Sequence, residues 1–149
     1  MPELIDCEAQ LTRDDIAALE AQLIARLPES LSQHYLQANG GEPSEQDREA
    51  GLWGWPLNSF NPIRHGHQTA ESLMRDLADD MKFDDEERQW QLGEFLPFAC
   101  DDGGNPLFVS LLADDYGAVY VAAPYDGVLQ RLADSFAAFR ARLFRIEVE

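Results

Sequence analysis

The sequence predicts an α+β domain, in which an antiparallel or mixed sheet of about four to six strands carries helices on one face. N-terminal helices, a middle helix and a C-terminal helix are expected to pack on it. Two observations predict this class: short apolar segments separated by turn residues fill 95–122, and helical periodicity precedes and follows that stretch. A chain of 149 residues can bury a core without disulfides or metals, so we expect one domain over 1–149.

Three segments have the length and composition of strands: Phe95–Cys100, Pro106–Leu111 and Ala118–Ala122 are rich in Phe, Val and Leu. Turn residues separate them at 101–105 (Asp-Asp-Gly-Gly-Asn) and at 114–117 (Asp-Asp-Tyr-Gly). Gly and Asn accept positive φ at low cost, and Asp bonds its own backbone. An antiparallel meander is therefore the simplest outcome.

The N-terminal part predicts two helices joined at a proline. Thr12 begins the first helix, with Asp15 at the capping-box position. Pro28 ends this helix at Leu27 and suits the first turn of a second helix. The second helix closes at 39–41 (Asn-Gly-Gly), whose residues tolerate a left-handed cap. The apolar face of the first helix consists of Ile16, Leu19, Leu23 and Leu27, and that of the second of Leu31, Tyr35 and Leu36.

Two more helices are expected downstream. Thr69 can cap one that places Met74, Leu77 and Met81 on one face. Asp134 and Ser135 begin the last one, whose apolar face consists of Phe136, Phe139 and Leu143. Residues 42–49 are predicted to be a polar loop, and Val128 and Leu129 to begin a short strand.

Trp53 and Trp55 lie on a segment, 51–56, that is expected to be an irregular strand. Residues two apart on an extended chain face the same side. The pair is therefore either a stacking platform for a ligand or an edge of the core, where Trp usually buries its ring.

Acidic residues dominate the charge, because 28 Asp and Glu against 11 Lys and Arg give a formal net charge of −17. Nine acids and two bases lie between Asp79 and Asp102. Such a surface repels nucleic acid and anionic membranes and attracts a basic partner. The same charge also serves solubility or salt adaptation, and the sequence alone leaves both interpretations open.

The sequence carries no GxSxG elbow, HExxH pair, glycine-rich phosphate loop or cysteine-pair zinc motif. His65 and His67 could bind a metal from one side of an extended segment, but no third ligand lies at a diagnostic spacing. Asp114 and Asp115 could do acid–base chemistry, yet no base or nucleophile accompanies them. We therefore expect no catalytic residue, no metal and no cofactor. A metal-dependent enzyme remains the least favoured function.

Cys7 and Cys100 are far apart and form no CxxC motif, so a reducing compartment is expected. The N-terminus carries acids and no apolar run, and no window approaches the roughly 20 apolar residues of a membrane span. The sequence thus predicts a soluble cytoplasmic protein that contacts neither membrane nor nucleic acid.

Six short motifs follow one another over nearly the whole chain. They are Leu27-Pro28, Asn39-Gly40-Gly41, Pro97-Phe98, Asp102-Gly103-Gly104, Val119-Tyr120 and Ala133-Asp134-Ser135-Phe136. Their order and spacing resemble the SUKH superfamily (Smi/Knr type), which includes fungal cell-wall-assembly regulators and many bacterial immunity proteins. Residues 42–90 depart most from its pattern. The resemblance implies that the strands of 95–122 are the scaffold, with Phe98, Leu107, Val109 and Val119 in the core.

The resemblance also implies a non-enzymatic protein-binding module, in bacteria most often an immunity protein that binds a cognate toxin domain. A toxin that acts on nucleic acid carries a basic cleft, which an acidic protein can occupy after charge-steered association. The alternative is a general interaction or scaffold protein with a cellular partner. The residues expected to face the partner are Trp53, Trp55, Asp84, Asp85, Glu86, Asp101, Asp102, Asp114 and Asp115.

Overall fold

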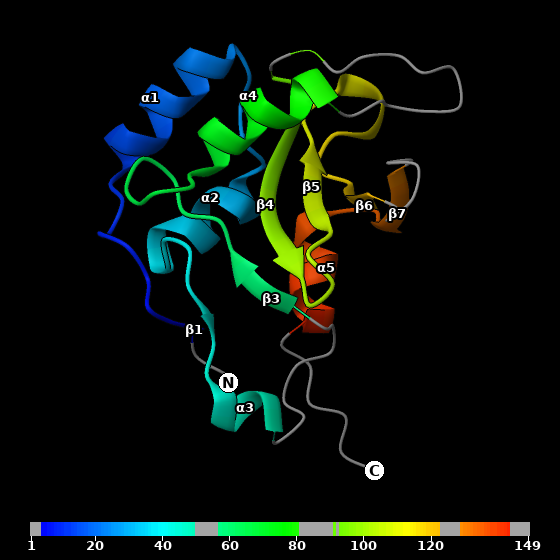
Figure 1. Ribbon diagram of the computed structural model, residues 1–149. Helices are drawn as coiled ribbons and strands as arrows, with labels where there is room; N and C mark the ends of the chain where they lie inside the picture. The colour runs from blue at the N-terminus through cyan, green and yellow to red at the C-terminus, as the bar shows by residue number, and fades with distance from the viewer. Residues whose placement is uncertain (1–3, 50–56, 81–90, 92, 123–128, 144–149) are drawn as a thin grey trace.

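A five-stranded antiparallel sheet lies at the centre of the computed structural model, which describes residues 4–49, 57–80, 91, 93–122 and 129–143 (Figure 1). The strand order is β3-β4-β5-β6-β7. The strands are β3 (Leu57–Phe60), β4 (Phe95–Asp101), β5 (Pro106–Ser110), β6 (Val119–Ala122) and β7 (Leu129–Ala133). The predicted meander is confirmed as β4, β5 and β6, and the short strand expected at Leu129 is β7.

Pro97 lies in β4, between β3 and β5, although proline has no N–H to donate to a neighbouring strand. The register shifts at this point, because Pro97 pairs with Phe108 whereas Ala99 pairs with Leu107. Such a bulge is one of the few sites in a sheet that tolerate proline. The Pro97 carbonyl accepts a hydrogen bond of 2.9 Å from the Asn61 side-chain amide, which lies beside the bulge.

Helices contribute their apolar faces to the larger of two buried clusters, which confirms the predicted α+β class. The smaller cluster consists of Phe95, Phe108 and Ala122. α4 packs on β4, and α2 packs against α5. Within the described residues the helices are α1 (Arg13–Leu23), α2 (Glu29–Gln37), α3 (Glu45–Glu49), α4 (Ala70–Asp80) and α5 (Phe136–Leu143), with a 3-10 turn η1 (Ala113–Asp115).

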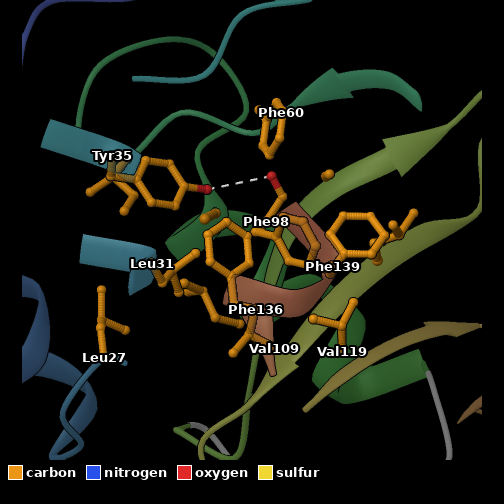
Figure 2. Close-up of a cluster of buried hydrophobic side chains, with 14 of the residues drawn as sticks. Leu27, Leu31, Tyr35, Phe60, Phe98, Val109, Val119, Phe136 and Phe139 are labelled. Atoms are coloured by element: carbon orange, nitrogen blue, oxygen red, sulfur yellow. Dashed lines mark hydrogen bonds between the residues drawn. The ribbon is translucent and has the colours of Figure 1, made fainter. Parts of the chain in front are cut away.

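Aromatic rings from three distant segments meet at the centre of this core. The Phe98 ring lies edge-on to Phe136 and Phe139, with centroids 5.4 and 5.7 Å apart. Figure 2 shows Tyr35 of α2 entering the same cluster, where its hydroxyl donates to the Phe98 carbonyl at 3.4 Å. A stronger hydrogen bond of 2.8 Å joins this hydroxyl to the Asn61 carbonyl. The four predicted core residues, Phe98, Leu107, Val109 and Val119, are all fully buried.

The capping box at Thr12 is confirmed, because Asp15 N–H donates to the Thr12 hydroxyl and Thr12 N–H to the Asp15 carboxylate. The predicted end of this helix at Leu27 is wrong. α1 ends at Leu23, and Ile24 takes the left-handed conformation with φ of 54°. The Glu20 carboxylate then accepts a hydrogen bond of 2.8 Å from Leu27 N–H, which satisfies the backbone beyond the helix.

Residues 42–49 are not the polar loop that their composition predicts. They form β2 (Glu42–Pro43), which pairs with β1 (Leu4–Ile5), and then the short helix α3. Ser44 caps α3 by accepting a hydrogen bond of 3.1 Å from Asp47 N–H. The irregular strand expected at 51–56 lies outside the described residues, and β3 begins at Leu57.

The predicted closure of the second helix at 39–41 is wrong, because α2 ends at Gln37 and its C-cap, Ala38, is extended rather than left-handed. Asn39, just beyond this cap, joins neighbouring segments. Its buried amide donates to the carbonyls of Ala9 and Ile63 at 2.9 and 3.0 Å, and its oxygen accepts from Ile63 N–H at 2.7 Å. Gly40 and Gly41 follow with φ of 81° and 91°. Asn39 therefore fastens the N-terminal segment and the 61–63 segment to the end of α2.

The last two predicted helices are confirmed as α4 and α5. The Thr69 hydroxyl caps α4 by accepting from Ser72 N–H at 3.2 Å, and Met74 is buried. In α5, Phe136, Phe139 and Leu143 are buried as expected. The Leu77 side chain and Met81 lie outside the described residues. Within the described part of the chain, no helix combines the length and hydropathy that a bilayer-crossing segment requires.

Candidate partner-binding surfaces

The turn between β4 and β5 is built around the carboxylate of Asp101. Its Oδ1 accepts hydrogen bonds from the backbone N–H groups of Gly103 at 3.0 Å and Asn105 at 2.9 Å. The Asn105 side chain donates to Oδ2 at 3.2 Å. Asp101 thus organises the turn, and its neighbour Asp102 is exposed to solvent.

In the segment between β5 and β6, one aspartate again accepts hydrogen bonds within the fold while its neighbour is exposed. The Asp115 carboxylate accepts hydrogen bonds from the hydroxyls of Ser110, at 2.5 Å, and Tyr120. Burial, together with the hydrogen bond to Asp115, raises the pKa of Tyr120 to about 12. Asp115 is half-buried and holds the segment to the sheet, whereas Asp114 is exposed.

The two acidic turns lie at opposite ends of the sheet (Figure 1). β5 runs from one turn to the other, and its five residues span roughly 15 Å. Asp101 and Asp102 therefore do not share a patch with Asp114 and Asp115. The other residues predicted to face a partner lie outside the described residues: Trp53, Trp55, Asp84, Asp85 and Glu86.

His65 and His67 lie in the segment before α4, half-buried and exposed respectively. Among the described residues, no group of three or more His, Cys, Asp or Glu side chains is arranged to hold a metal ion. Cys7 and Cys100 are both free thiols. The Cys100 sulfur lies 3.4 Å from the Ser59 hydroxyl, and burial raises the pKa of the Cys7 thiol.

Sequence reasoning missed a buried histidine on the apolar face of α2. His34 packs its ring against Tyr35, Phe60 and Phe136. Its Nδ1 accepts a hydrogen bond of 3.1 Å from Arg140 Nε, and its buried Nε2 has no hydrogen-bond partner among the described residues. The signal was present in the sequence, because His34 follows Leu31 by three positions and so shares its helical face.

A groove of about 620 Å³ opens between α1, the connection from α1 to α2, and the segment before β6. We call it the α1–α2 groove. The residues that define it are Ile16, Ala17 and Glu20 of α1, Leu27 and Pro28 of the connection, and Tyr116. No local pattern indicates this groove, since its residues come together only when the segment between β5 and β6 folds over the connection.

Charged side chains of both signs line the α1–α2 groove. Arg13 pairs with Glu29 at 2.8 Å across its rim, with both side chains largely exposed. This hydrogen-bonded pair lowers the pKa of the Glu29 carboxyl. Arg26 also lines the groove, where its positive charge helps to lower the pKa of Glu29, and its backbone carbonyl accepts a hydrogen bond of 2.5 Å from the Tyr116 hydroxyl.

Comparison with known proteins gives one family. A model of the SMI1 / KNR4 family (SUKH-1) matches residues 10–142. The match covers the whole five-stranded sheet and the described helices, apart from the last residue of α5. A search among curated proteins finds no match.

Proposed function

The chain belongs to the SMI1/KNR4 family (SUKH-1), which includes immunity proteins, and from this we propose that it binds and neutralises a cognate toxin domain. In this proposal the chain acts by occupying its partner and performs no catalysis. A long-lived complex would block the toxin's own site.

The net charge of −17 is the observation that carries the choice of partner. A domain that acts on nucleic acid needs a positively charged cleft to hold the phosphate backbone. An acidic protein is steered to such a cleft and associates with it faster than a neutral protein does. We therefore propose a basic toxin domain as the partner.

The hydrogen bonds of the acidic turns sort the proposed contact residues into two groups. Asp102 and Asp114 are exposed, and we propose that they meet the partner, as do Asp84, Asp85 and Glu86. The carboxylates of Asp101 and Asp115 accept hydrogen bonds within the fold, so we propose that these two residues stabilise the turns. Trp53 and Trp55 are proposed as apolar contacts with the partner.

The proposal predicts that the open reading frame immediately upstream ends in a small basic toxin domain. The binding test uses that domain, purified in a catalytically inactive form. Its association with the intact chain is followed by stopped-flow fluorescence from about 50 mM to about 500 mM NaCl. We expect the association rate to fall at least tenfold over this range, because salt screens the steering field. A tight complex whose rate is insensitive to salt would contradict the acidic-surface mechanism.

Matched charge removals locate the contact. Asp102→Asn with Asp114→Asn removes two exposed acids from the turns, and Glu45→Gln with Glu49→Gln removes two exposed acids from α3. Asp84→Asn with Asp85→Asn tests the proposed acidic run. We expect the turn and acidic-run variants to associate about tenfold more slowly, and the α3 variant to match the unmodified chain.

The second candidate is an interaction or scaffold protein with cellular partners. The family supports this reading too, since its members are not confined to immunity. It predicts several partners of modest affinity and no dependence on an adjacent toxin gene. Quantitative affinity capture from native cells separates the two, because an immunity protein retains one dominant partner in stoichiometric amount.

A further inference from the structure

Asn39 and Gly40 form the asparagine pair of this chain that is chemically most prone to deamidation. The reaction begins when the backbone nitrogen of the following residue attacks the side-chain carbonyl carbon of the asparagine. A following glycine leaves that nitrogen unhindered, because it has no Cβ. Of the four asparagines, Asn61 and Asn105 precede proline, whose nitrogen carries no hydrogen to lose, and Asn58 precedes a serine. The chemistry therefore singles out Asn39.

The folded structure blocks this reaction at the side chain of Asn39. The residue is 2% exposed, and its Nδ2 donates to the carbonyls of Ala9 and Ile63 at 2.9 and 3.0 Å. Its Oδ1 accepts from Ile63 N–H at 2.7 Å. Ring closure expels Nδ2 and with it both donated hydrogen bonds, inside a site where such a loss is costly. The folded state therefore disfavours the reaction.

The backbone on the other side of the reacting bond is fixed as well. The Asn39 carbonyl accepts a hydrogen bond of 2.9 Å from Glu8 N–H. Gly40 has a φ of 81°, and a Cβ added to it would lie 3.1 Å from Pro62 Cβ. The Gly40 nitrogen therefore has little freedom to approach the side chain of Asn39. Reaction requires the segment of Asn39, Gly40 and Gly41, which we call the 39–41 corner, to open.

We propose that Asn39-Gly40 is a site of spontaneous deamidation, which reacts in those copies of the chain whose 39–41 corner has opened. The Gly40 nitrogen loses its proton and bonds to the side-chain carbonyl carbon of Asn39. The bond from that carbon to Nδ2 breaks, and Nδ2 leaves with the proton as ammonia. Water then adds to either carbonyl of the succinimide ring, which opens to aspartate or isoaspartate. The reaction consumes water and needs no oxidant or reductant.

Either product opposes return to the folded state. In the aspartate form, an oxygen replaces Nδ2 and faces the carbonyls of Ala9 and Ile63 with no hydrogen to donate. In the isoaspartate form, the backbone gains a CH₂ group and Gly40 is displaced, although it already packs against Pro62. Deamidation thus converts a transient opening into a permanent loss of the fold, and it limits the lifetime of the chain.

Mass spectrometry of the peptide that contains residues 39 and 40 measures the reaction. The intact chain is incubated at neutral pH, folded in buffer and unfolded in guanidinium chloride. Because deamidation is slow compared with opening and closing, its rate in the folded chain follows the population of the open form. We expect modification of the folded chain to be at least about tenfold slower than that of the unfolded chain. Equal rates in the two would overturn the inference.

Matched variants in guanidinium chloride, where folding plays no part, locate the reaction. Asn39→Gln lengthens the side chain, so a larger and less readily formed ring replaces the succinimide. This variant should lose most of the mass gain, whereas Asn58→Gln, the same change at an exposed asparagine of β3, should keep it. An undiminished mass gain in Asn39→Gln would show that the reaction occurs elsewhere.

Refolding tests the consequence for the fold. The chain is aged in guanidinium chloride, diluted into buffer and briefly digested with a protease that cleaves unfolded chains. The surviving chain should be depleted at least about fivefold in the forms modified at Asn39, since these do not regain the protected fold. Equal survival of modified and unmodified chains would contradict the inference. The site is the same whatever the chain binds, so this result and the toxin-binding result can fail separately.

Discussion

The Nδ1 atom of His34 accepts a hydrogen bond of 3.1 Å from Nε of Arg140, at the contact between α2 and α5. The ring is buried against Phe60 and Phe136. Burial, assisted by the positive charge of Arg140, lowers the pKa of His34 from 6.5 to about 3. The folded chain therefore holds this histidine neutral.

This pair makes the stability of the fold depend on pH. Between about pH 6.5 and about pH 3, the unfolded chain binds a proton at His34 that the folded chain does not bind. The free energy of unfolding must fall as the pH falls through this window, by about 2 kcal/mol at pH 5 relative to neutral pH. Urea unfolding at about pH 7 and pH 5 measures the loss.

His34→Phe is the control for that measurement, because it keeps an aromatic ring in the core and removes the titrating group. Its free energy of unfolding should lose about 2 kcal/mol less than the unmodified chain over the same interval. Equal losses in the two proteins would show that other groups set the pH dependence.

Ile24→Asn should stabilise the fold. Asn adopts the left-handed conformation more readily than Ile, and the replaced side chain makes no buried contact, so we expect a gain of about 1 kcal/mol. The control is Gln22→Asn, at an exposed position inside α1, where the lower helix propensity of Asn costs a few tenths, about 0.3 kcal/mol. Thermal unfolding compares them, and a loss of stability in Ile24→Asn would contradict the strain argument.

Asn39→Ala should be strongly destabilising. It removes three hydrogen bonds and leaves the buried Ile63 N–H without an acceptor, at a cost of about 3 kcal/mol. Gln68→Ala, at an exposed position, should stay within about 0.5 kcal/mol of the unmodified chain. Chemical unfolding of both variants tests the assignment, which fails if their stabilities are alike.

The two adjacent aspartates of the segment before β6 should differ in how much they stabilise the fold, as measured by chemical unfolding. Asp115→Ala removes the carboxylate that accepts hydrogen bonds from the buried Ser110 hydroxyl and from the Tyr120 hydroxyl. The free energy of unfolding is expected to fall by about 2 kcal/mol. Asp114→Ala changes an exposed residue and should cost less than about 0.5 kcal/mol. A similar loss in both would mean that Asp115 does not hold the segment before β6.

The sheet and most helix starts were predictable because their signals are local. Apolar runs, Asp-Gly turns and the Thr12 capping box act within a few residues, and the structure confirms them. The interactions that end α1 are not local. It depends on Glu20 reaching Leu27 and on Gly93, where an added Cβ would lie 2.5 Å from the Leu23 carbonyl.

The candidate contact residues show the same division. Composition marks both members of each Asp-Asp pair as acidic surface. In the structure the carboxylates of Asp101 and Asp115 are partly buried and accept hydrogen bonds within the fold, whereas Asp102 and Asp114 are exposed. Nothing in the sequence distinguishes the two members. The α1–α2 groove was beyond sequence reasoning as well, since Tyr116 and Arg26 are 90 positions apart.

Protection of a cell from the proposed toxin domain tests the central claim most directly. The toxin domain is expressed from an inducible promoter, with and without this chain, and viable cells are counted after induction. Neutralisation by binding predicts that survival is restored by the intact chain and lost in the Asp102→Asn, Asp114→Asn, Asp84→Asn, Asp85→Asn variant. Undiminished killing in the presence of the intact, folded chain would contradict the account.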